Sequence, residues 1–195
     1  KDNAAKNLWK EIVMPSQMQV KTIVVALDGS DHAYKALDFA ADLAEKYSAR
    51  LIALNVLSEQ PLNDEERHFA VTEYHVEEFS KLDASSLMDV RGDPRVVAGM
   101  LVKQYSNAES KMRQAVCERL MSEARARAKS RGIENLETLF EEGDPATNIL
   151  ATAKDKNADL IILGSRGLSD LKGLLMGSVS HKVSQLAECT CITVK

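Results

Sequence analysis

Three glycines that follow an apolar run form the most informative pattern in the sequence. Gly164-Ser165-Arg166-Gly167 comes directly after residues 160–163, Leu-Ile-Ile-Leu, and Gly177-Ser178 follows nine residues later, before a helix-like segment over residues 179–187. Glycines between a buried strand and a helix start let the backbone turn with positive φ and approach a ligand closely. The free N–H groups and the dipole of the next helix attract anionic oxygens. The pattern predicts a phosphate site, although glycines after a strand also simply turn a chain.

A second pattern lies near the start of the chain. Residues 23–27, Ile-Val-Val-Ala-Leu, predict a buried strand, and Asp28-Gly29-Ser30 follows it. The glycine spacing matches neither G-x-G-x-x-G nor G-x-x-x-x-G-K-[ST]. Gly164, Gly167, Gly177 and Ser178 instead complete the pattern G-x2-G-x9-G-[ST]. With the strand that ends in an aspartate, this pattern resembles the ATP-binding members of the universal stress protein family. The resemblance covers about residues 20–57 and 108–195.

The resemblance implies a binding site for ATP, with Mg²⁺ expected alongside it. It places adenosine at Ala26, Leu27 and Asp28, with Val56 against adenine. Ribose and phosphates would pass the end of the fourth strand, and the next helix start would cradle the phosphates through N–H groups and hydroxyls. The residues concerned are Leu163, Gly164, Gly167, Gly177, Ser178, Val179 and Ser180.

Two members of this site have alternative interpretations from the residues alone. Asp28 can accept hydrogen bonds from a ribose diol, but Asp-Gly-Ser is also a common turn and helix entry. Arg166 occupies a variable position of the motif, where it either pairs with phosphate or faces solvent.

The chain lacks the parts of an efficient phosphoryl-transfer enzyme. Such enzymes need a residue that positions the nucleophile, carboxylates that hold metal, and a cation on the departing charge. Asp28 is the sole acid at a matched loop position, and His181 fits a core or surface role better than that of a base. We therefore expect no catalytic residues and no dedicated metal site, and a regulatory, stress-response protein that holds ATP. A slow ATPase and a nucleotide-independent interaction module remain as alternatives.

The elements that would position this site alternate along the chain. Strands are predicted over residues 21–27, 51–57, 136–140, 159–163 and 191–194. A helix capped by Ser30 or Asp31 carries the apolar stripe Ala33, Ala36, Leu37, Ala40, Leu43, Ala44 and Tyr47. A second helix over residues 108–131 carries Met112, Val116, Leu120, Ala124 and Ala128, and a third opens at Asp144-Pro145. This order predicts an α/β fold: an open, doubly wound, five-stranded parallel sheet of the Rossmann-like, adenine nucleotide alpha hydrolase type.

Two segments fall outside the resemblance. Residues 1–19 predict an N-terminal arm whose Trp9 packs on the domain or on a partner, or else a disordered end. The domain itself would span residues 20–195, with a helical insert at about 58–107. Within the insert we expect an amphipathic helix over residues 64–82 and a helix start at Asp93-Pro94.

Composition limits the other possibilities. The formal charge is −4, with 25 basic and 29 acidic side chains, so we do not expect a nucleic-acid partner. Cys117, Cys189 and Cys191 fit a reducing compartment and small buried residues better than a metal site. No run is apolar enough to insert into a membrane, and the start resembles no signal peptide, so a cytoplasmic location is expected.

The last predicted strand has a consequence for assembly. Residues 191–194, Cys-Ile-Thr-Val, form an uncharged β-branched strand, and strand order in the family places it at a sheet edge. Open edges pair readily with another strand. We therefore expect a homodimer through residues 191–194, as the resemblance also implies; a monomer whose arm covers the edge is the alternative. The sequence does not identify a further protein partner.

Overall fold

The computed structural model describes residues 19–57, 94–168 and 176–195, with backbone only for residues 94–109 and 111. The elements are β1 (Thr22–Ala26), α2 (Asp31–Tyr47), β2 (Arg50–Leu57), α5 (Pro94–Ser130), β3 (Glu137–Glu142), α6 (Pro145–Asp155), β4 (Leu160–Gly164), α7 (Ser178–Leu186) and β5 (Thr190–Val194). Each predicted strand is present, with ends that differ by one or two residues. The predicted α/β class is confirmed.

The strands form one parallel sheet in the order β3-β2-β1-β4-β5. β1 lies in the centre and pairs with β2 on one side and with β4 on the other. After β1, the chain adds β2 and β3 on one side of the sheet and then returns to add β4 and β5 on the other side. The point where the order reverses lies between β1 and β4, and ligands of such sheets bind at this point, beyond the carboxyl ends of the strands.

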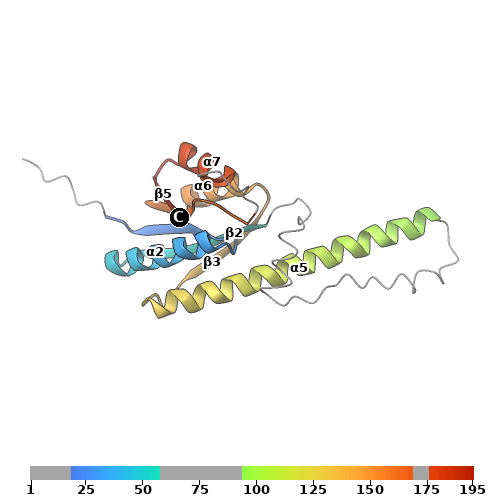
Figure 1. The fold of residues 1–195 in the computed structure, drawn as a ribbon, viewed down its shortest axis with the longest axis horizontal. Coiled ribbons are helices and arrows are strands. Elements are labelled where there is room, and N and C mark those ends of the chain that lie inside the picture. Colours follow the sequence, from blue (N-terminus) through green and yellow to red (C-terminus); the bar gives the residue numbers. More distant parts are fainter. Residues whose placement is uncertain (1–18, 58–93, 169–175) are drawn as a thin grey trace, which may run out of the picture.

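Helices cover both faces of the sheet (Figure 1). α2 and α5 lie on one face, over alternate residues of the central strands such as Ile23, Val25 and Leu51. α6 and α7 cover the other face, over Val24, Ile52 and Ile161. Because both faces are covered, β1 is apolar at consecutive positions, as its sequence predicts.

Local signals in the sequence set the starts of α2 and α6. Ser30 caps α2, and its hydroxyl accepts a hydrogen bond from Ala33 N at 3.2 Å. Asp144 caps α6 through Thr147 N at 2.9 Å. The predicted stripe of α2 is buried at its alanines and at Leu37, but its inclusion of Tyr47 is wrong. Tyr47 is 46% exposed because it lies in the last turn, where Ala44 ends the buried row.

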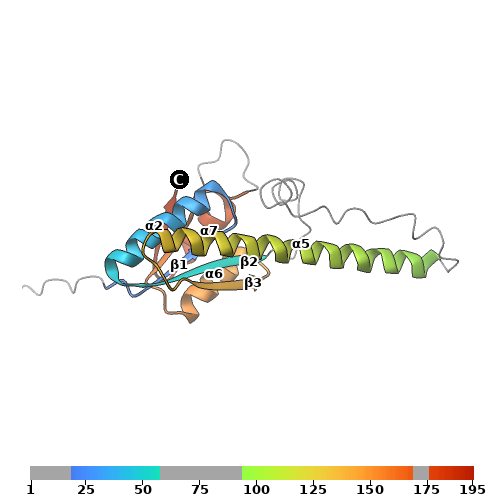
Figure 2. The same cartoon turned by 90° about the horizontal axis from the view of Figure 1, so that it is seen from below.

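α5 differs most from the prediction. We expected one helix start at Pro94 and a separate helix from residue 108, whereas a single helix of 37 residues runs from Pro94 to Ser130. Residues 102–107 contain neither Pro nor Gly, so nothing in them interrupts the helix. The helix ends before Gly132, whose φ is 87°. Figures 1 and 2 show that its C-terminal part lies along α2, while its N-terminal part extends beyond the sheet.

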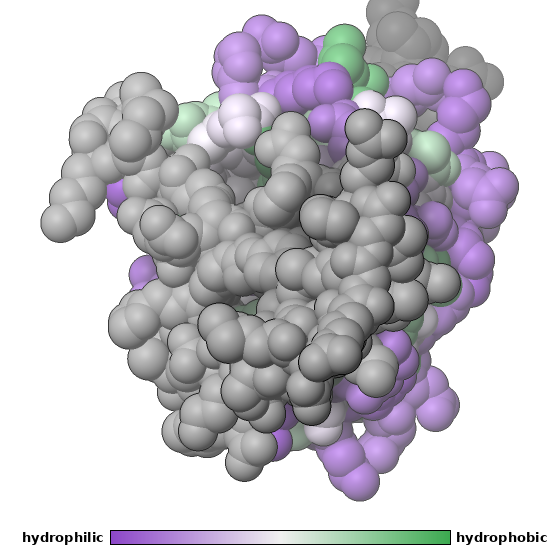
Figure 3. All heavy atoms as spheres, turned by 90° about the vertical axis from the view of Figure 1, so that its right-hand side faces the viewer, coloured by the Kyte–Doolittle hydropathy of each residue, from purple (hydrophilic) through white to green (hydrophobic). Residues whose placement is uncertain are grey.

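The buried face of α5 is wider than predicted. Met112, Leu120, Ala124 and Ala128 are buried as expected, but Val116 is only half-buried, and Cys117 and Met121 are buried beside them. The described surface visible in Figure 3 is mostly hydrophilic.

Several expectations fall on residues that are not described. These are the N-terminal arm with Trp9, the helix over residues 64–82 and most of the insert at 58–107. In the described part of the chain, no helix is long and apolar enough to cross a membrane.

Candidate functional site

The two loops singled out by the sequence leave the sheet side by side. Ala26 at the end of β1 is the register partner of Leu163 in β4. Asp28 follows β1 and Ser165 follows β4, so the two chain segments leave the sheet at the same edge, where the strand order reverses. The sheet thus brings together residues that lie more than 130 positions apart in sequence.

The Asp28 carboxylate joins these two loops. Its Oδ1 accepts hydrogen bonds from Ser30 N at 2.9 Å and from Ser30 Oγ at 2.6 Å. Its Oδ2 accepts a longer one from Leu168 N at 3.3 Å. A Cβ added to Gly167 would lie only 2.5 Å from Oδ2. Gly167 therefore leaves the space that the carboxylate fills, while Asp28 as a whole stays exposed.

Gly164 has a different neighbour. An added Cβ would lie 2.9 Å from the His32 carbonyl carbon and 3.0 Å from Ala33 N, both in the first turn of α2. The prediction of positive φ at these glycines is wrong: among described glycines, only Gly29, Gly132 and Gly143 have it. Gly164 and Gly167 are required instead for close approach, to a helix backbone and to a carboxylate respectively.

Ser165 connects the loop to three elements, and the sequence analysis did not identify it. The residue is 1% exposed, and its N–H donates to Val194 O at 2.7 Å. Its carbonyl accepts from Gly177 N at 2.7 Å and from Ser180 Oγ at 2.8 Å. Its hydroxyl lies 3.0 Å from His32 Nδ1. A serine inside a glycine-rich motif carries no sequence signal for such a role, since it is equally common in exposed loops.

The N-terminus of α7 lies next to this loop and has no side-chain cap. Gly177 is the N-cap residue, with φ −78°, and has no side-chain oxygen to accept from the first N–H groups. Ser178 is exposed and Val179 half-buried. α2 and α6, in contrast, are capped by Ser30 and Asp144. The first N–H groups of α7 therefore keep their capacity to bind an anion.

Ser180 faces inward rather than toward solvent. It is 3% exposed, and its hydroxyl lies within hydrogen-bond distance of Ser165 O at 2.8 Å and Gly177 O at 3.0 Å. A hydroxyl has a single hydrogen to donate, and both neighbours are carbonyl acceptors. Its observed role is to hold the loop against α7.

The other predicted site residues lie around the same edge. Ala26 and Val56 are half-buried, and their side chains pack at the margin of the core under α6 and α7. Leu27 and Leu163 are each 3% exposed, so their backbone groups rather than their side chains are near the edge. Arg166 is half-buried, and its carbonyl lies 3.4 Å from Ser30 Oγ.

Among the described residues, the titratable groups with shifted pKa values lie outside the two loops of the site. Hydrogen bonds from Thr147 and Lys182 lower the pKa of Asp144 to about 2, but this carboxylate caps α6. Burial raises the pKa of Cys189 and Cys191, which pack against the core under α6 and α7. Among the described residues there is no group of three or more side chains arranged to hold a metal ion.

Comparison with known proteins identifies the kind of domain. The sequence model described as "Universal stress protein family" matches residues 19–195. The protein is 34% identical over 173 residues to the Universal stress protein YxiE of Bacillus subtilis, an alignment that covers 89% of this chain and 97% of YxiE.

Solved structures agree in fold. The Universal stress protein UspA from Lactobacillus plantarum aligns with a TM-score of 0.56 at 23% identity, over 91% of this chain and 99% of its own. A universal stress protein in complex with cAMP gives a TM-score of 0.56 at 22% identity, over 91% and 98%. The universal stress protein from Archaeoglobus fulgidus in complex with dAMP gives 0.52 at 20% identity, over 91% and 99%.

Proposed function

Because the chain belongs to the universal stress protein family, we propose that it binds an adenine nucleotide, ATP together with Mg²⁺, at the carboxyl edge of β1 and β4. The observation that carries the proposal is the contact of the Asp28 carboxylate with the Gly167-Leu168 loop, beside a helix N-terminus without a cap. In this proposal the protein is regulatory: it holds the nucleotide, and whether a nucleotide is bound affects its interaction with partners.

Each part of ATP has a chemically suitable neighbour in this proposal. The exposed Asp28 carboxylate accepts hydrogen bonds, which suits the two hydroxyls of a ribose. The N–H groups at Ser178, Val179 and Ser180 and the exposed Ser178 hydroxyl suit phosphate. In this proposal ribose and phosphate pass the backbone at Gly164 and Gly167, whose missing side chains leave room for α2 and for the Asp28 carboxylate. Arg166 supplies a cation within the same loop.

Adenine is the base that we propose. The half-buried side chains of Ala26 and Val56 offer an apolar surface for this base, beside the points where the chain leaves the sheet after Leu27 and Leu163. The complexes of two proteins of similar fold, one with cAMP and one with dAMP, both contain this base. Since the described residues include no cluster of metal ligands, Mg²⁺ would be held mainly by the phosphates.

The test is calorimetric titration of the protein with ATP in the presence of Mg²⁺. Asp28→Ala should weaken binding at least about tenfold, because it removes charge-assisted hydrogen bonds. Asp31→Ala is the matched control, since it removes the same charge from an exposed site three residues away. Equal affinity of the two variants would contradict the proposed site, and mass spectrometry of ligand released from the purified protein would identify the nucleotide directly.

A homodimer through β5 is the second part of the proposal. β5 is an edge strand, and Cys191, Ile192 and Val194 are only partly buried. Val194 O accepts from Ser165 N, so the alternation of a strand turns the N–H and C=O groups of Thr193 toward the open edge. A second copy related by a twofold axis could pair with these groups in antiparallel orientation.

Slow ATP hydrolysis is compatible with this site, but a regulatory role is favoured. Among the described residues, Asp28 is the one acid at a position that matches the motif loops, and its carboxylate is already engaged by Ser30 and Leu168. Such an arrangement suits holding a nucleotide better than consuming it.

A further inference from the structure

A buried chain of polar groups connects α5 to the residue that precedes Asp28. The Asn55 side chain, 7% exposed, donates from Nδ2 to Leu27 O at 2.7 Å. On its other side, Oδ1 accepts from the thiol of Cys117 at 3.0 Å. Cys117 lies on α5 and is 3% exposed. The contact between β1, β2 and α5 is therefore polar at one point of an otherwise apolar layer.

The direction of these hydrogen bonds is determined by chemistry. The Leu27 carbonyl can only accept, so the amide nitrogen of Asn55 must face it. The amide oxygen is then left for the thiol, which must donate. Leu27 N also donates to Leu54 O at 2.8 Å, so both backbone groups of Leu27 are held by β2.

The two hydrogen bonds of the Leu27 backbone with β2 fix the point where the chain leaves the sheet. β1 ends at Ala26, Leu27 is held by β2, and Gly29 turns the chain with φ 89°. Asp28 lies between the held residue and the turn. The direction of its carboxylate toward Gly167 and Leu168 thus depends on the Leu27 carbonyl staying where Asn55 holds it.

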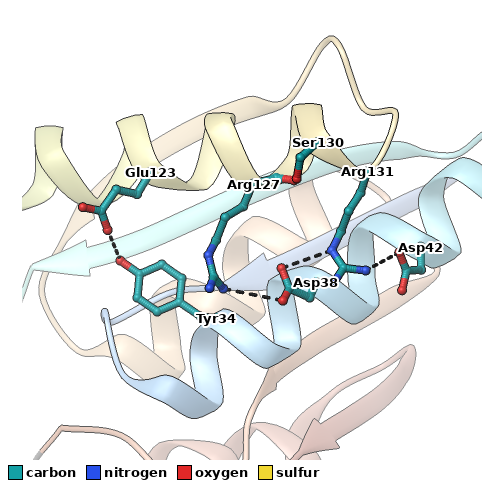
Figure 4. Close-up of polar contacts among 7 residues, drawn as sticks. All are labelled: Tyr34, Asp38, Asp42, Glu123, Arg127, Ser130 and Arg131. Atoms are coloured by element: carbon teal, nitrogen blue, oxygen red, sulfur yellow. Dashed lines mark hydrogen bonds and ion pairs between the residues drawn. The ribbon is translucent and has the colours of Figure 1, made fainter.

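α5 is in turn attached to the domain by a row of contacts with α2 (Figure 4). Glu123 accepts from Tyr34 OH at 2.6 Å, and Arg127 lies 3.5 Å from Asp38 and 4.6 Å over the Tyr34 ring. Arg131 pairs with Asp38 at 3.3 Å and with Asp42 at 2.6 Å. Each exposed pair contributes little alone, but the row fixes the register of the two helices.

Cys117 lies on the N-terminal side of that row. Glu123 and Arg127 of α5, with Arg131 directly after it, carry the contacts with α2. The helix runs from Cys117 back to Pro94, and its N-terminal part extends beyond the sheet. A movement of the N-terminal part of α5 would therefore reach the Cys117–Asn55 contact before it reaches the row of contacts with α2. Because each of the two residues is buried, neither can replace its partner by water without cost.

We propose that Asn55 is a positioning residue for Asp28, and that Cys117 couples α5 to the nucleotide edge through it. The ligand named here rests on the proposed function, while the positioning itself does not. Coupling of this kind is reciprocal: whatever shifts α5 changes nucleotide affinity, and the nucleotide changes α5 by the same factor.

The thiol acts here as a hydrogen-bond donor and not as a reactive group. Burial, with a smaller contribution from the charge of Glu118, raises the pKa of Cys117 to about 12. The thiol thus stays protonated at neutral pH, as donation to Asn55 requires.

The experiment compares four variants by ATP calorimetry and by chemical denaturation. Asn55→Leu removes both hydrogen bonds and should weaken ATP binding about tenfold; Cys117→Ala removes the donor and should weaken it about threefold. Cys117→Ser keeps a donor and should stay within about twofold of the wild type. Leu120→Val is the control, since it trims the same buried face of α5 without touching a polar group. It should lower stability and leave affinity unchanged.

A second measurement needs no nucleotide. In ¹⁵N spectra of the free protein, Cys117→Ala should shift the amide signals of Gly29, Ser30 and Leu168 more than Leu120→Val does. If the wild type binds ATP and the two variants cannot be distinguished in affinity or in these signals, the coupling is refuted. If the wild type does not bind ATP but the signals shift as expected, the proposed ligand is wrong and the positioning role stands. The comparison of ¹⁵N spectra uses only Cys117→Ala and Leu120→Val, so it can still be made if Asn55→Leu does not fold.

Discussion

Gly164→Ala and Gly167→Ala should separate the folding role of the glycine motif from its binding role. The two residues stand three positions apart in one loop, and both contacts of an added Cβ are closer than van der Waals distance. At Gly164 the added atom meets the backbone of His32 and Ala33, which cannot move without α2. At Gly167 it meets the end of the exposed Asp28 side chain, which can rotate away.

The expected magnitudes follow from these neighbours. Overpacking against backbone costs about 1–3 kcal/mol, which for a chain of this size lowers Tm by roughly 2–10 °C. Gly167→Ala should change stability by less than about 1 kcal/mol, because the gain from a stiffer unfolded chain offsets the weak Leu168 contact. Moving the carboxylate should, however, weaken ATP binding by about 10-fold to 150-fold, the worth of charge-assisted hydrogen bonds.

A double-mutant cycle makes the reasoning refutable. If the added methyl acts by displacing the carboxylate, Gly167→Ala should weaken binding no further once Asp28 is already Ala. ATP calorimetry on the wild type, Gly167→Ala, Asp28→Ala and the double variant supplies the four corners, and thermal unfolding of these proteins and of Gly164→Ala measures the stability changes. Full additivity of the two binding losses, or a Gly167→Ala protein that binds like the wild type, would show that Gly167 does not act through Asp28.

Three further outcomes are expected. Gly177→Val, which the φ of −78° at Gly177 permits, should abolish ATP binding in calorimetry. ATP hydrolysis by the wild type should stay well below the ~1–100 s⁻¹ of kinases. A turnover in that range that is lost in Gly177→Val would make the protein an enzyme. Thr193→Pro removes an N–H from the open edge of β5 and should give a monomer by light scattering, whereas a dimer that persists would place the interface elsewhere. Asp144→Asn keeps a capping oxygen but loses the charge. Because hydrogen bonds from Thr147 and Lys182 depress the pKa of Asp144 to about 2 in the folded protein, the advantage of the wild type in urea unfolding should be full at pH 6 and fade as the pH falls from about 4 toward 2. An equal difference at both ends would exclude the Asp144 charge as its cause.

The sequence predicts the fold well because the fold depends on local and periodic signals. Five apolar runs alternate with helical stripes, and Ser30 and Asp144 mark helix starts by their own side chains. Tyr47 was misplaced because periodicity does not reveal where a helix leaves the core. The unbroken α5 was missed for a related reason: we divided a helix where the pattern weakened, although no residue there interrupts it.

The residues that hold the site together were less predictable. Ser165, His32, Asn55 and Cys117 act through partners that lie from 12 to 133 positions away in sequence. A polar residue in a predicted strand, such as Asn55 in β2, is the one available signal, because a buried amide requires partners. The sequence cannot name those partners, since they depend on strand order and on how α5 crosses the sheet.

The glycine motif therefore does more than leave room for phosphate. Gly164 allows the first turn of α2 to reach β4, Gly167 makes room for a carboxylate from another strand, and Gly177 starts α7 without a side-chain cap. Two of the three glycines are thus explained by contacts within the chain, before any ligand is considered. Loss of binding in a glycine variant is for that reason weak evidence of direct ligand contact. A ligand can contact the glycine loop directly, or it can bind the Asp28 carboxylate that the loop positions. Only an experiment that also includes an Asp28 variant distinguishes these two cases.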